Sequence, residues 1–497
     1  MSFSINKLNK KKYQLPKNLN DLSGIKNFVN KNKNKKIIVV QGLGFVGAVM
    51  ALVCSNSVSE EYAVIGIDLP TKDTFWKIKS INEGIFPIVA DDPKIDKFFE
   101  HTKVKGNLYA TYDPIAYQYA DVIVVDINLD VMKNSKKNGK LLTFDINMQN
   151  FESAIESIGK NCTENVTILI ETTVPPGTCE RTVKPIIDKE FGKRGLSKKK
   201  YYLGHSYERV MPGPNYIDSI REYPRVYSGI DNKSADKIES FLRTIIDTSL
   251  CDLKRLEHTN ATEISKVLEN SYRAMNIAFI VEWSRFAEEA GVDLYSIVDA
   301  IKDRDTHKNI MYPGIGVGGY CLTKDPLLAS WSRKTFFNTE SELEMSINAV
   351  STNDQMPFFA FERLKEVIGD FNKKKILFLG VSYRGDVGDT RFSPVELLVK
   401  LIKDSGAETN FHDPYIDFWQ EQDCPVEKDL KKALACKPDV IIISTGHTEY
   451  KKKETVSMIM SLPHLCIFDT IGLLDDRQLE GLKEKHTISV LGRGDLK

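Results

Sequence analysis

A glycine-rich stretch that ends in a cysteine is the part of the sequence that most directly suggests chemistry. Ile315 to Pro326 reads I-G-V-G-G-Y-C-L-T-K-D-P, with a lysine and an aspartate three and four positions after Cys321. Glycine lets the backbone adopt positive φ and approach a bound group closely, which a loop around a ligand requires. Free cysteine is, however, among the most buried residue types. The stretch alone therefore leaves two interpretations open: a ligand-binding loop, or a structural turn beside a buried thiol.

A second glycine-rich stretch, near the amino terminus, fits a nucleotide-binding pattern. The apolar run Ile37–Gln41 leads into G-L-G-F-V-G at Gly42 and then into a helical stretch. This order is typical of dinucleotide-binding units, in which the helix amino terminus meets the pyrophosphate. The next apolar run, Tyr62–Ile67, ends in Asp68, whose charge would bind the ribose hydroxyls and repel a 2′-phosphate. We therefore expect NAD rather than NADP, with contacts from Gly42, Gly44, Phe45, Val46, Gly47, Asp68 and Thr173.

Apolar runs continue to alternate with helical stretches after this unit. Asp121–Val125 and Val166–Ile170 are two such runs, and the alternation predicts a mostly parallel sheet. The second run is followed by E-T-T-V-P-P-G-T, in which Pro-Pro-Gly forces a turn at the carboxyl end of a strand. Doubly wound sheets bind ligands at that edge. Thr173 lies there, although a plain strand-to-helix turn is the alternative for each of these threonines.

The carboxyl-terminal part resembles a second nucleotide-binding half. Lys375–Gly380 is again a strand that ends in glycine, and Val440–Ser444 supplies a later strand. This half lacks a complete G-x-G-x-x-G and need not bind a dinucleotide. Its loop after Gly380 carries charges suited to a phosphate or a ribose, with ordinary surface ion pairs as the alternative: Arg384, Asp386, Asp389 and Arg391.

A long helix is predicted between the two halves. Thr262 to Ala290 has apolar residues at helical spacing and no proline, which corresponds to ~44 Å of helix. Such a helix usually supports both lobes and often a dimer contact. Lys266 and Asn270 are four residues apart and share one face of it, although a solvated face is the ordinary explanation for Lys266. The fold class we predict is α/β, with two Rossmann-like doubly wound domains joined by a central helical domain.

The composition excludes several classes of protein. The chain has 497 residues, 42% of them hydrophobic, and equal numbers of basic and acidic residues (68 each), so no global charge favours nucleic acid or an acidic membrane. Its eight cysteines form no C-x-x-C pair, which argues against a disulfide framework or a metal site and for a reducing cytoplasm. The first 36 residues lack an apolar signal-peptide core, and the run Lys31–Lys36 is expected to be a solvated lead-in.

These parts together resemble the UDP-glucose/GDP-mannose dehydrogenase family of nucleotide-sugar 6-dehydrogenases, over nearly everything after residue 36. The matching motifs stand in the family's order: G-L-G-F-V-G at Gly42, I-N-E-G-I-F-P-I at Ile81, E-T-T-V-P-P-G-T at Glu171, Y-E-R-V-M-P-G at Tyr207, K-V-L-E-N at Lys266, G-V-G-G-Y-C-L-T-K-D-P at Gly316 and Y-R-G-D-V-G-D-T-R-F-S-P at Tyr383. The resemblance implies four domains: a basic extension (1–36), an NAD-binding domain (37–255), a central helical and dimerisation domain with the cysteine loop (256–352), and a UDP-sugar-binding domain (353–497).

The resemblance also implies a reaction and roles for residues. The family oxidises a sugar C6 hydroxyl to a carboxylate with two hydride transfers, and a thiolate can hold the intermediate as a thiohemiacetal and then a thioester. Cys321 matches the nucleophile, Lys266 and Asn270 the pair that donates to the developing alkoxide, and Asp325 and Glu208 the carboxylates that order water. Substrate contacts are expected from Glu208, Arg209, Gly318, Gly319, Tyr383, Arg384 and Arg391. The expected substrate is a UDP-sugar, and the expected assembly is a homodimer or a higher homo-oligomer.

Three departures from the family pattern bear on the substrate. Asp126–Asp130 stands where the family commonly has V-P-T-P, so the threonine near the catalytic water is absent, and Thr173 or Thr178 is a candidate replacement. D-T-I-G at Asp469 lacks the arginine of the D-G-R in UDP-glucose members. Pro212 replaces a second glutamate, which favours the UDP-N-acetylhexosamine branch, whereas C-L-T-K-D-P keeps the lysine of the UDP-glucose branch.

Three alternatives to a UDP-N-acetylhexosamine dehydrogenase follow. A UDP-glucose 6-dehydrogenase would fit most motifs equally well. The two-electron β-hydroxyacid dehydrogenases share the amino-terminal fold and a helical Lys…Asn pair, but need neither the cysteine loop nor the second α/β half. A catalytically silent nucleotide-sugar-binding protein would explain the missing V-P-T-P. The yield of NADH per substrate separates a nucleotide-sugar 6-dehydrogenase, which gives two, from a two-electron β-hydroxyacid dehydrogenase, which gives one. Binding without turnover identifies the silent binding protein.

Overall fold

Two compact units make up the chain in the computed structural model, which describes residues 2–88, 90, 92–210 and 213–496. The first unit contains the chain up to Asp130 together with Ile146–Val267 and Lys334–Asn338. The second contains Val131–Asp145, Leu268–Arg333 and the chain from Thr339 onward.

The first unit is built on an eight-stranded sheet in the order β12-β11-β10-β9-β6-β3-β4-β5. Its strands are β3 (Lys36–Gln41), β4 (Tyr62–Ile67), β5 (Leu108–Thr111), β6 (Val122–Val125), β9 (Thr167–Ile170), β10 (Tyr202–His205), β11 (Arg225–Gly229) and β12 (Leu253–Arg255). All neighbours pair in parallel except β10 with β11, which are antiparallel. The chain runs from β3 through β4 to β5 and then returns to β6 on the other side of β3. This reversal confirms the predicted doubly wound domain and places its ligand edge at the carboxyl ends of β3 and β6.

Helices cover both faces of this sheet, which explains why its strands are continuous apolar runs. They are α2 (Phe45–Ser55), α3 (Phe75–Asn82), α4 (Pro93–Lys105), α5 (Gln149–Asn161), α6 (Lys184–Lys193), α7 (Tyr216–Arg221) and α8 (Asn232–Ile245). Val40 and Val64 join a core with α2, α4 and α8, while their neighbours Val39 and Ile65 point to the opposite face, and all four are fully buried. Strands buried on both faces do not alternate with polar residues.

Residues 2–36 fold as part of this unit. They form a hairpin, β1 (Phe3–Ile5) with β2 (Lys12–Gln14), and a helix, α1 (Leu22–Lys31). Buried Asn6 donates to Ser80 Oγ at 2.8 Å, Asp21 accepts the Tyr109 hydroxyl at 2.7 Å, and Ile25 is completely buried. Most of the stretch is therefore folded, while Lys31, Lys33, Asn34 and Lys36 are exposed, as expected for a solvated lead-in to β3.

The second unit contains a five-stranded, fully parallel sheet in the order β14-β13-β17-β18-β19. Its strands are β13 (Lys375–Leu379), β14 (Glu408–His412), β17 (Val440–Ile443), β18 (Cys466–Asp469) and β19 (Thr487–Val490). Its helices are α10 (Leu294–Lys302), α11 (Asp325–Thr335), α12 (Glu344–Ile368), α13 (Pro394–Asp404), α14 (Leu430–Leu434), α15 (Lys453–Ser461) and α16 (Asp476–Lys483). The second doubly wound sheet that the sequence predicts is confirmed.

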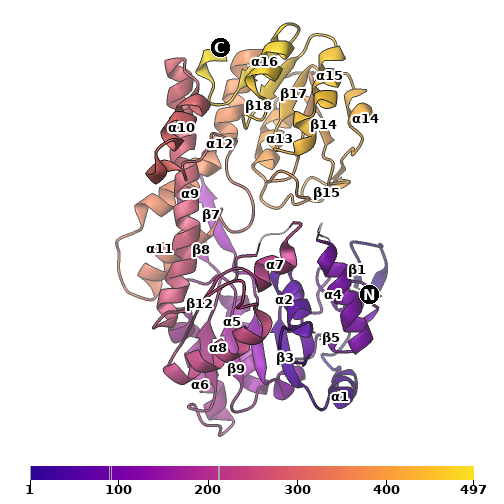
Figure 1. Ribbon diagram of the computed structural model, residues 1–497, viewed down its shortest axis with the longest axis vertical. Helices are drawn as coiled ribbons and strands as arrows, with labels where there is room; N and C mark the ends of the chain where they lie inside the picture. Colours follow the sequence, from indigo (N-terminus) through magenta and orange to yellow (C-terminus); the bar gives the residue numbers. More distant parts are fainter. Residues whose placement is uncertain (1, 89, 91, 211–212, 497) are drawn as a thin grey trace. The chain divides into compact units, whose positions relative to one another are not determined.

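Two further features complete the fold. The long helix α9 spans Thr259–Ala290, so it begins three residues before the predicted start (Figure 1). A hairpin of β7 (Val131–Ser135) and β8 (Leu141–Ile146) follows β6 in the chain and, up to Asp145, belongs to the second unit. Across the described ranges, none of the helices combines the length and the apolar character that a membrane span needs.

Candidate active site

The glycine turn between β3 and α2 has the geometry that a pyrophosphate requires. Gly42 has φ +97°, and a Cβ there would collide with the Asp126 carbonyl, while one on Gly47 would collide with the Gly42 carbonyl. No described atom lies within 4 Å of a Cβ built on Gly44. The first and third glycines are therefore needed for the turn and for packing of α2, and the second leaves open space at the helix amino terminus. This arrangement fits an NAD pyrophosphate beside Phe45 and Val46 in the first turn of α2.

Asp68 lies at the carboxyl end of β4 and stabilises the same turn. Its carboxylate accepts the backbone N–H of Leu43 at 3.1 Å and that of Leu69 at 2.8 Å. Burial raises the pKa of Asp68, partly offset by the charge of Lys77. The predicted ribose-binding residue thus also holds the glycine turn, a second role that the sequence pattern did not reveal.

The two candidate threonines of the turn after β9 differ in their surroundings. Thr178 is buried and donates to the Pro175 carbonyl at 2.6 Å, so its hydroxyl proton is used within its own turn. Thr173 is half-buried. Buried Glu263 accepts the backbone N–H groups of Gly177 at 2.6 Å and Cys179 at 2.9 Å, which fixes the turn.

A buried group of charges lies at the carboxyl ends of β6 and β9. Arg225 contacts Glu171 at 2.5 Å, and Asp126 is buried beside them. Burial and the charge of Glu171 raise the pKa of Asp126 well above its usual range, which favours its protonated form. Asp126 stands where the family commonly begins V-P-T-P, so the departure from the pattern places a buried acid at the ligand edge of the sheet.

The predicted catalytic residues of the first unit cluster around Tyr207. Buried Lys266, on α9, donates to the backbone carbonyl of Glu208 at 3.0 Å, and its ammonium lies 5.3 Å from the centre of the Tyr207 ring. Arg209 stacks on the same ring at 5.5 Å and donates to the Pro224 carbonyl. The structure therefore brings Lys266, Glu208 and Arg209 together. Tyr207, whose ring lies near both cations, was not assigned a role from the sequence.

Pro212, whose position favoured the UDP-N-acetylhexosamine branch, lies outside the described residues.

Cys321 is exposed, which removes the interpretation of a buried structural thiol. All eight cysteines lie in the described part of the chain, and Cys321 is the single exposed one among them. Its backbone carbonyl accepts the N–H of Asp325 at 2.9 Å, so Cys321 stands immediately before the first turn of α11. This position at a helix amino terminus suits a thiolate.

Asp325 is completely buried, and both of its carboxylate oxygens have partners. Lys324 contacts Oδ1 at 2.8 Å and Asn270 donates to Oδ2 at 2.6 Å. The structure thus joins the predicted Asn270 and Asp325 directly. It adds Lys324, which the sequence identified only as a branch marker and which also lies 4.4 Å from the centre of the Tyr320 ring.

The glycines before Cys321 pack against the carboxyl-terminal half. A Cβ on Gly318 would collide with Tyr383, and Gly319, at φ +82°, faces the Tyr383 ring and donates its N–H to the Arg391 carbonyl at 3.2 Å. Tyr383 and the two glycines therefore lie together, and the absence of glycine side chains permits this close packing.

Some of the charged side chains in the loop after β13 already have hydrogen-bond partners within the protein. Arg391 forms two hydrogen bonds with Asp389, at 2.9 and 2.6 Å, and Asp386 accepts the Thr448 hydroxyl at 2.6 Å. Arg384 is exposed. Among the four charges, Arg384 is thus the cation best placed to meet an incoming phosphate.

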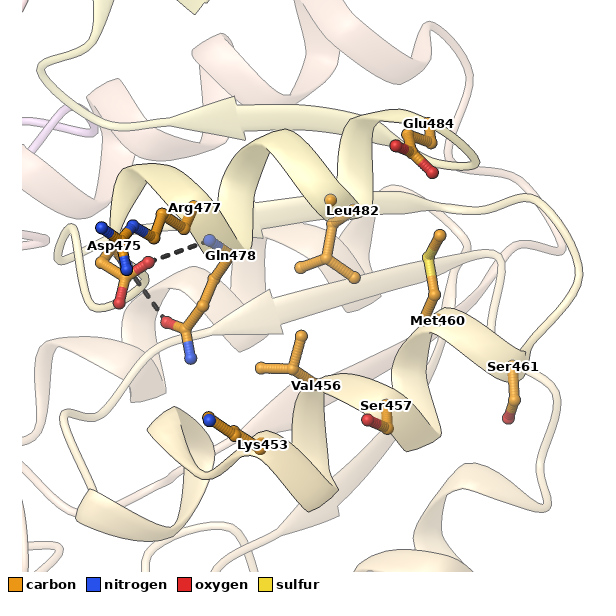
Figure 2. Close-up of a pocket in the computed structure, with 11 residues that line it drawn as sticks. Lys453, Val456, Ser457, Met460, Ser461, Asp475, Arg477, Gln478, Leu482 and Glu484 are labelled. Carbon is orange, nitrogen blue, oxygen red and sulfur yellow. Dashed lines mark hydrogen bonds between the residues drawn. The ribbon is translucent and has the colours of Figure 1, made fainter.

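A cavity of about 710 Å³ lies between α15 and α16 and contains none of these residues. Figure 2 shows Val456 of α15 and Leu482 of α16 lining its middle, with Lys453 and Arg477 toward one end. It has no connection with the candidate catalytic groups.

Comparison with known proteins identifies the family. Three family models match in chain order: the NAD binding domain of the UDP-glucose/GDP-mannose dehydrogenase family over residues 35–246, the central domain over 260–355 and the UDP binding domain over 377–476. UDP-N-acetyl-D-mannosamine dehydrogenase of Methanocaldococcus jannaschii is 31% identical, over 94% of this chain and 99% of the relative.

Solved structures agree with this assignment. UDP-D-ManNAc dehydrogenase from Pyrococcus horikoshii is 28% identical with a TM-score of 0.74, over 92% of this chain and 100% of that one. NDP-N-acetyl-D-galactosaminuronic acid dehydrogenase from Methanosarcina mazei, at 23% identity and a TM-score of 0.73 over 95% and 98% of the two chains, shares the fold. The chain belongs to the UDP-glucose/GDP-mannose dehydrogenase family and is an NAD-dependent nucleotide-sugar dehydrogenase with a UDP-binding domain.

Proposed function

We propose that the protein oxidises the C6 hydroxyl of a UDP-N-acetylhexosamine to the carboxylate, with Cys321 as the nucleophile. The observation that carries the proposal is that Cys321 is exposed and its backbone accepts the N–H of Asp325, whose buried carboxylate contacts Asn270 and Lys324. Its lead substrate is UDP-N-acetyl-D-mannosamine, because relatives that carry this name match nearly the full chain at up to 31% identity.

The proposed reaction consumes one water and two NAD per sugar. Two NAD molecules, bound one after the other at the glycine turn, would each accept one hydride from C6. After the first transfer, the Cys321 thiolate adds to the aldehyde to form a thiohemiacetal; after the second, the product is a thioester. Water then cleaves the C–S bond, which releases the carboxylate and regenerates the thiol. The net change is RCH₂OH + 2 NAD⁺ + H₂O → RCOO⁻ + 2 NADH + 3 H⁺.

The remaining residues position protons and charge in this proposal. Lys266 and Asn270, one helical turn apart on α9, donate to the oxygen that carries developing negative charge. Asp325 fixes the Asn270 amide through the 2.6 Å hydrogen bond, so this donor is oriented before substrate arrives. Glu208 orders the hydrolytic water, and Thr173 is the remaining candidate for the missing V-P-T-P threonine.

An NADH-release screen tests the proposal. The purified protein would be given UDP-ManNAc, UDP-GlcNAc, UDP-GalNAc, UDP-Glc and GDP-Man with NAD, and NADH would be counted per sugar consumed. We expect two NADH per UDP-N-acetylhexosamine and the highest kcat/KM for UDP-ManNAc. One NADH per substrate would contradict the four-electron reaction, a preference for UDP-Glc would favour the UDP-glucose branch, and binding without turnover would identify a silent binding protein.

We also propose that two copies of the chain associate through α9. Large side chains along this helix are about half exposed or more: Leu268 (63%), Tyr272 (52%), Phe279 (53%), Trp283 (45%) and Phe286 (59%). The rings of Phe279 and Phe286 lie 6.1 and 6.0 Å from that of Trp283, which makes one continuous aromatic surface. An exposed apolar stripe of this kind favours a partner, and a symmetric copy is the commonest one.

A further inference from the structure

The β7–β8 hairpin forms one wall of a cavity in the second unit. Lys133 of β7 contacts Asp354 of α12 at 2.6 Å, and the Leu141 N–H of β8 donates to Ser351 Oγ at 3.1 Å. At the hairpin turn, Gly139 has φ +80°, and a Cβ there would meet the Asp354 carbonyl at 2.6 Å. The turn is therefore fitted closely against α12 rather than projecting into solvent.

The cavity has a volume of about 400 Å³, within the range of small-ligand sites. The hairpin, α12 and the start of α13 contribute to its lining, and so do Val317 and Thr323, which flank Cys321 in the sequence. Thr323 donates its hydroxyl to the Gly319 carbonyl at 3.0 Å, so the wall is tied to the cysteine loop. A ligand in this cavity would contact the cysteine loop through Val317 and Thr323, which have no assigned role in the reaction.

Two buried oxygens at this cavity lack hydrogen-bond partners among the described residues. Asn353 is 3% exposed and Ser393 is 4% exposed, and both line the cavity. Asn353 uses its amide nitrogen to donate to the Ala274 carbonyl, but its Oδ1 has no partner, and neither has Ser393 Oγ. A buried oxygen without a partner is energetically unfavourable, so these two atoms favour a ligand that supplies a donor such as a hydroxyl.

The charges around the cavity favour an anion. Lys133, Lys136 and Lys400 line it, against two carboxylates, Asp354 and Glu396. Lys133 is matched by Asp354, and Glu396 is the other carboxylate of the lining. Three ammonium groups thus face two carboxylates, which leaves an excess of positive charge beside the exposed Lys136 and Lys400, and lysine is a usual point-charge partner of phosphate. Pro357, Phe358 and Pro394 provide carbon surfaces that suit the C–H faces of a sugar ring.

We propose that this cavity binds a phosphorylated sugar and that the bound molecule acts on the Cys321 loop. The ligand's phosphate meets Lys136 and Lys400, and its hydroxyls satisfy Asn353 and Ser393. Occupancy restrains Val317 and Thr323, and through them the loop that carries the thiol. The lining of this cavity includes none of the predicted substrate contacts, so failure of the sugar-phosphate proposal would leave the proposed reaction intact.

Isothermal titration with N-acetyl-D-glucosamine 6-phosphate tests the site. The full-length protein would be saturated with UDP and NADH beforehand, so that heat reports binding outside the substrate and cofactor sites. We expect one saturable event per chain, with inorganic phosphate and free N-acetyl-D-glucosamine each binding at least tenfold more weakly, because each offers only part of the contacts (~1.4 kcal/mol). No saturable binding, or equal binding by inorganic phosphate alone, would overturn the proposal of a sugar-phosphate site.

Two variants and a matched control sharpen the result. Ser393→Ala removes a hydroxyl that holds nothing in the described chain, and Lys400→Ala removes an exposed cation; each should weaken binding about three- to tenfold. Lys365→Ala, on the exposed side of α12, should leave binding unchanged. Equal affinities in all three variants would contradict the assignment.

The coupling has its own readout. Alkylation of Cys321 by iodoacetamide, followed by peptide mass spectrometry, should change in rate when the sugar phosphate is added to wild-type protein. The Ser393→Ala variant should need a proportionately higher concentration for the same change. An alkylation rate that does not respond to a ligand shown to bind would refute the action on the loop.

Discussion

Replacing Asp68 separates its two roles, charge and support of the glycine turn. Asp68→Asn keeps an oxygen that can accept the Leu43 N–H, which lies 3.1 Å away, but removes the charge. Asp68→Ala removes both. We expect the asparagine variant to lose selectivity for NAD over NADP while retaining the turn, and the alanine variant to bind both cofactors weakly.

The magnitude follows from the charge that a 2′-phosphate would meet. Two unit charges ~5–6 Å apart at an effective dielectric constant of ~20 repel by about 3 kcal/mol, and solvent screening of the half-buried carboxylate reduces this value. We therefore expect the wild type to prefer NAD by at least about tenfold in kcat/KM, or ~1.4 kcal/mol. Because burial raises the pKa of Asp68, the preference should narrow as the pH falls and the carboxylate becomes neutral.

Steady-state kinetics with both cofactors at several pH values provide the measurement. The ratio of kcat/KM for NAD to that for NADP should fall toward one in Asp68→Asn, mainly because NADP improves. Thermal unfolding serves as the control that the turn survives. An unchanged ratio in Asp68→Asn, or equal use of both cofactors by the wild type, would refute the reasoning.

Three further predictions concern stability and assembly. Arg225→Met should lower the free energy of unfolding by about 3–5 kcal/mol because it leaves buried Glu171 unpaired. Adding Glu171→Gln should restore part of this loss in a denaturant titration. No recovery in the double variant would show that the ion pair is unimportant. Burial raises the pKa of Glu263 to about 7, so the protein should lose about 3 kcal/mol of stability as the pH rises from about 4.5 through 7. Unfolding titrations of Glu263→Gln should show a flatter pH dependence, and the same slope as wild type would count against this assignment. Trp283→Glu should convert a dimer to a monomer in light scattering without loss of helical circular dichroism, whereas an unchanged mass would argue against the α9 contact.

Short sequence patterns predicted those parts of the structure that are determined by contacts between residues close together in the sequence. The turn from Gly42 to Gly47 could be recognised because the positive φ of Gly42 and the close approach of Gly47 to the Gly42 carbonyl are local constraints. Strands β3 and β13 could be recognised because strands buried on both faces are continuous apolar runs. The long helix could be recognised from its apolar spacing, with an error of three residues at its start. Helix ends are the least determined part of such a pattern.

Contacts between distant residues could not be predicted in the same way. Glu171 and Arg225 are 54 residues apart, and their pairing depends on β9 and β11 lying on the same side of the sheet. The β7–β8 hairpin reads as a polar loop, K-N-S-K-K-N-G-K, because its packing against α11 and α12 rests on few apolar residues such as Leu141. The amino-terminal hairpin was missed for the same reason, since one of its anchors is the polar Asn6.

The most direct test of the proposed reaction is the intact mass of Cys321 variants after incubation with NAD and the UDP-sugar that is turned over. In Cys321→Ser, an alkoxide can add to the aldehyde, but the resulting ester hydrolyses less readily than a thioester. We predict a covalent sugar adduct on this variant, at most trace uronate, and a loss of uronate formation by several orders of magnitude in Cys321→Ala. Near-normal uronate formation by Cys321→Ala, with two NADH per sugar, would contradict the assignment of Cys321 as the nucleophile.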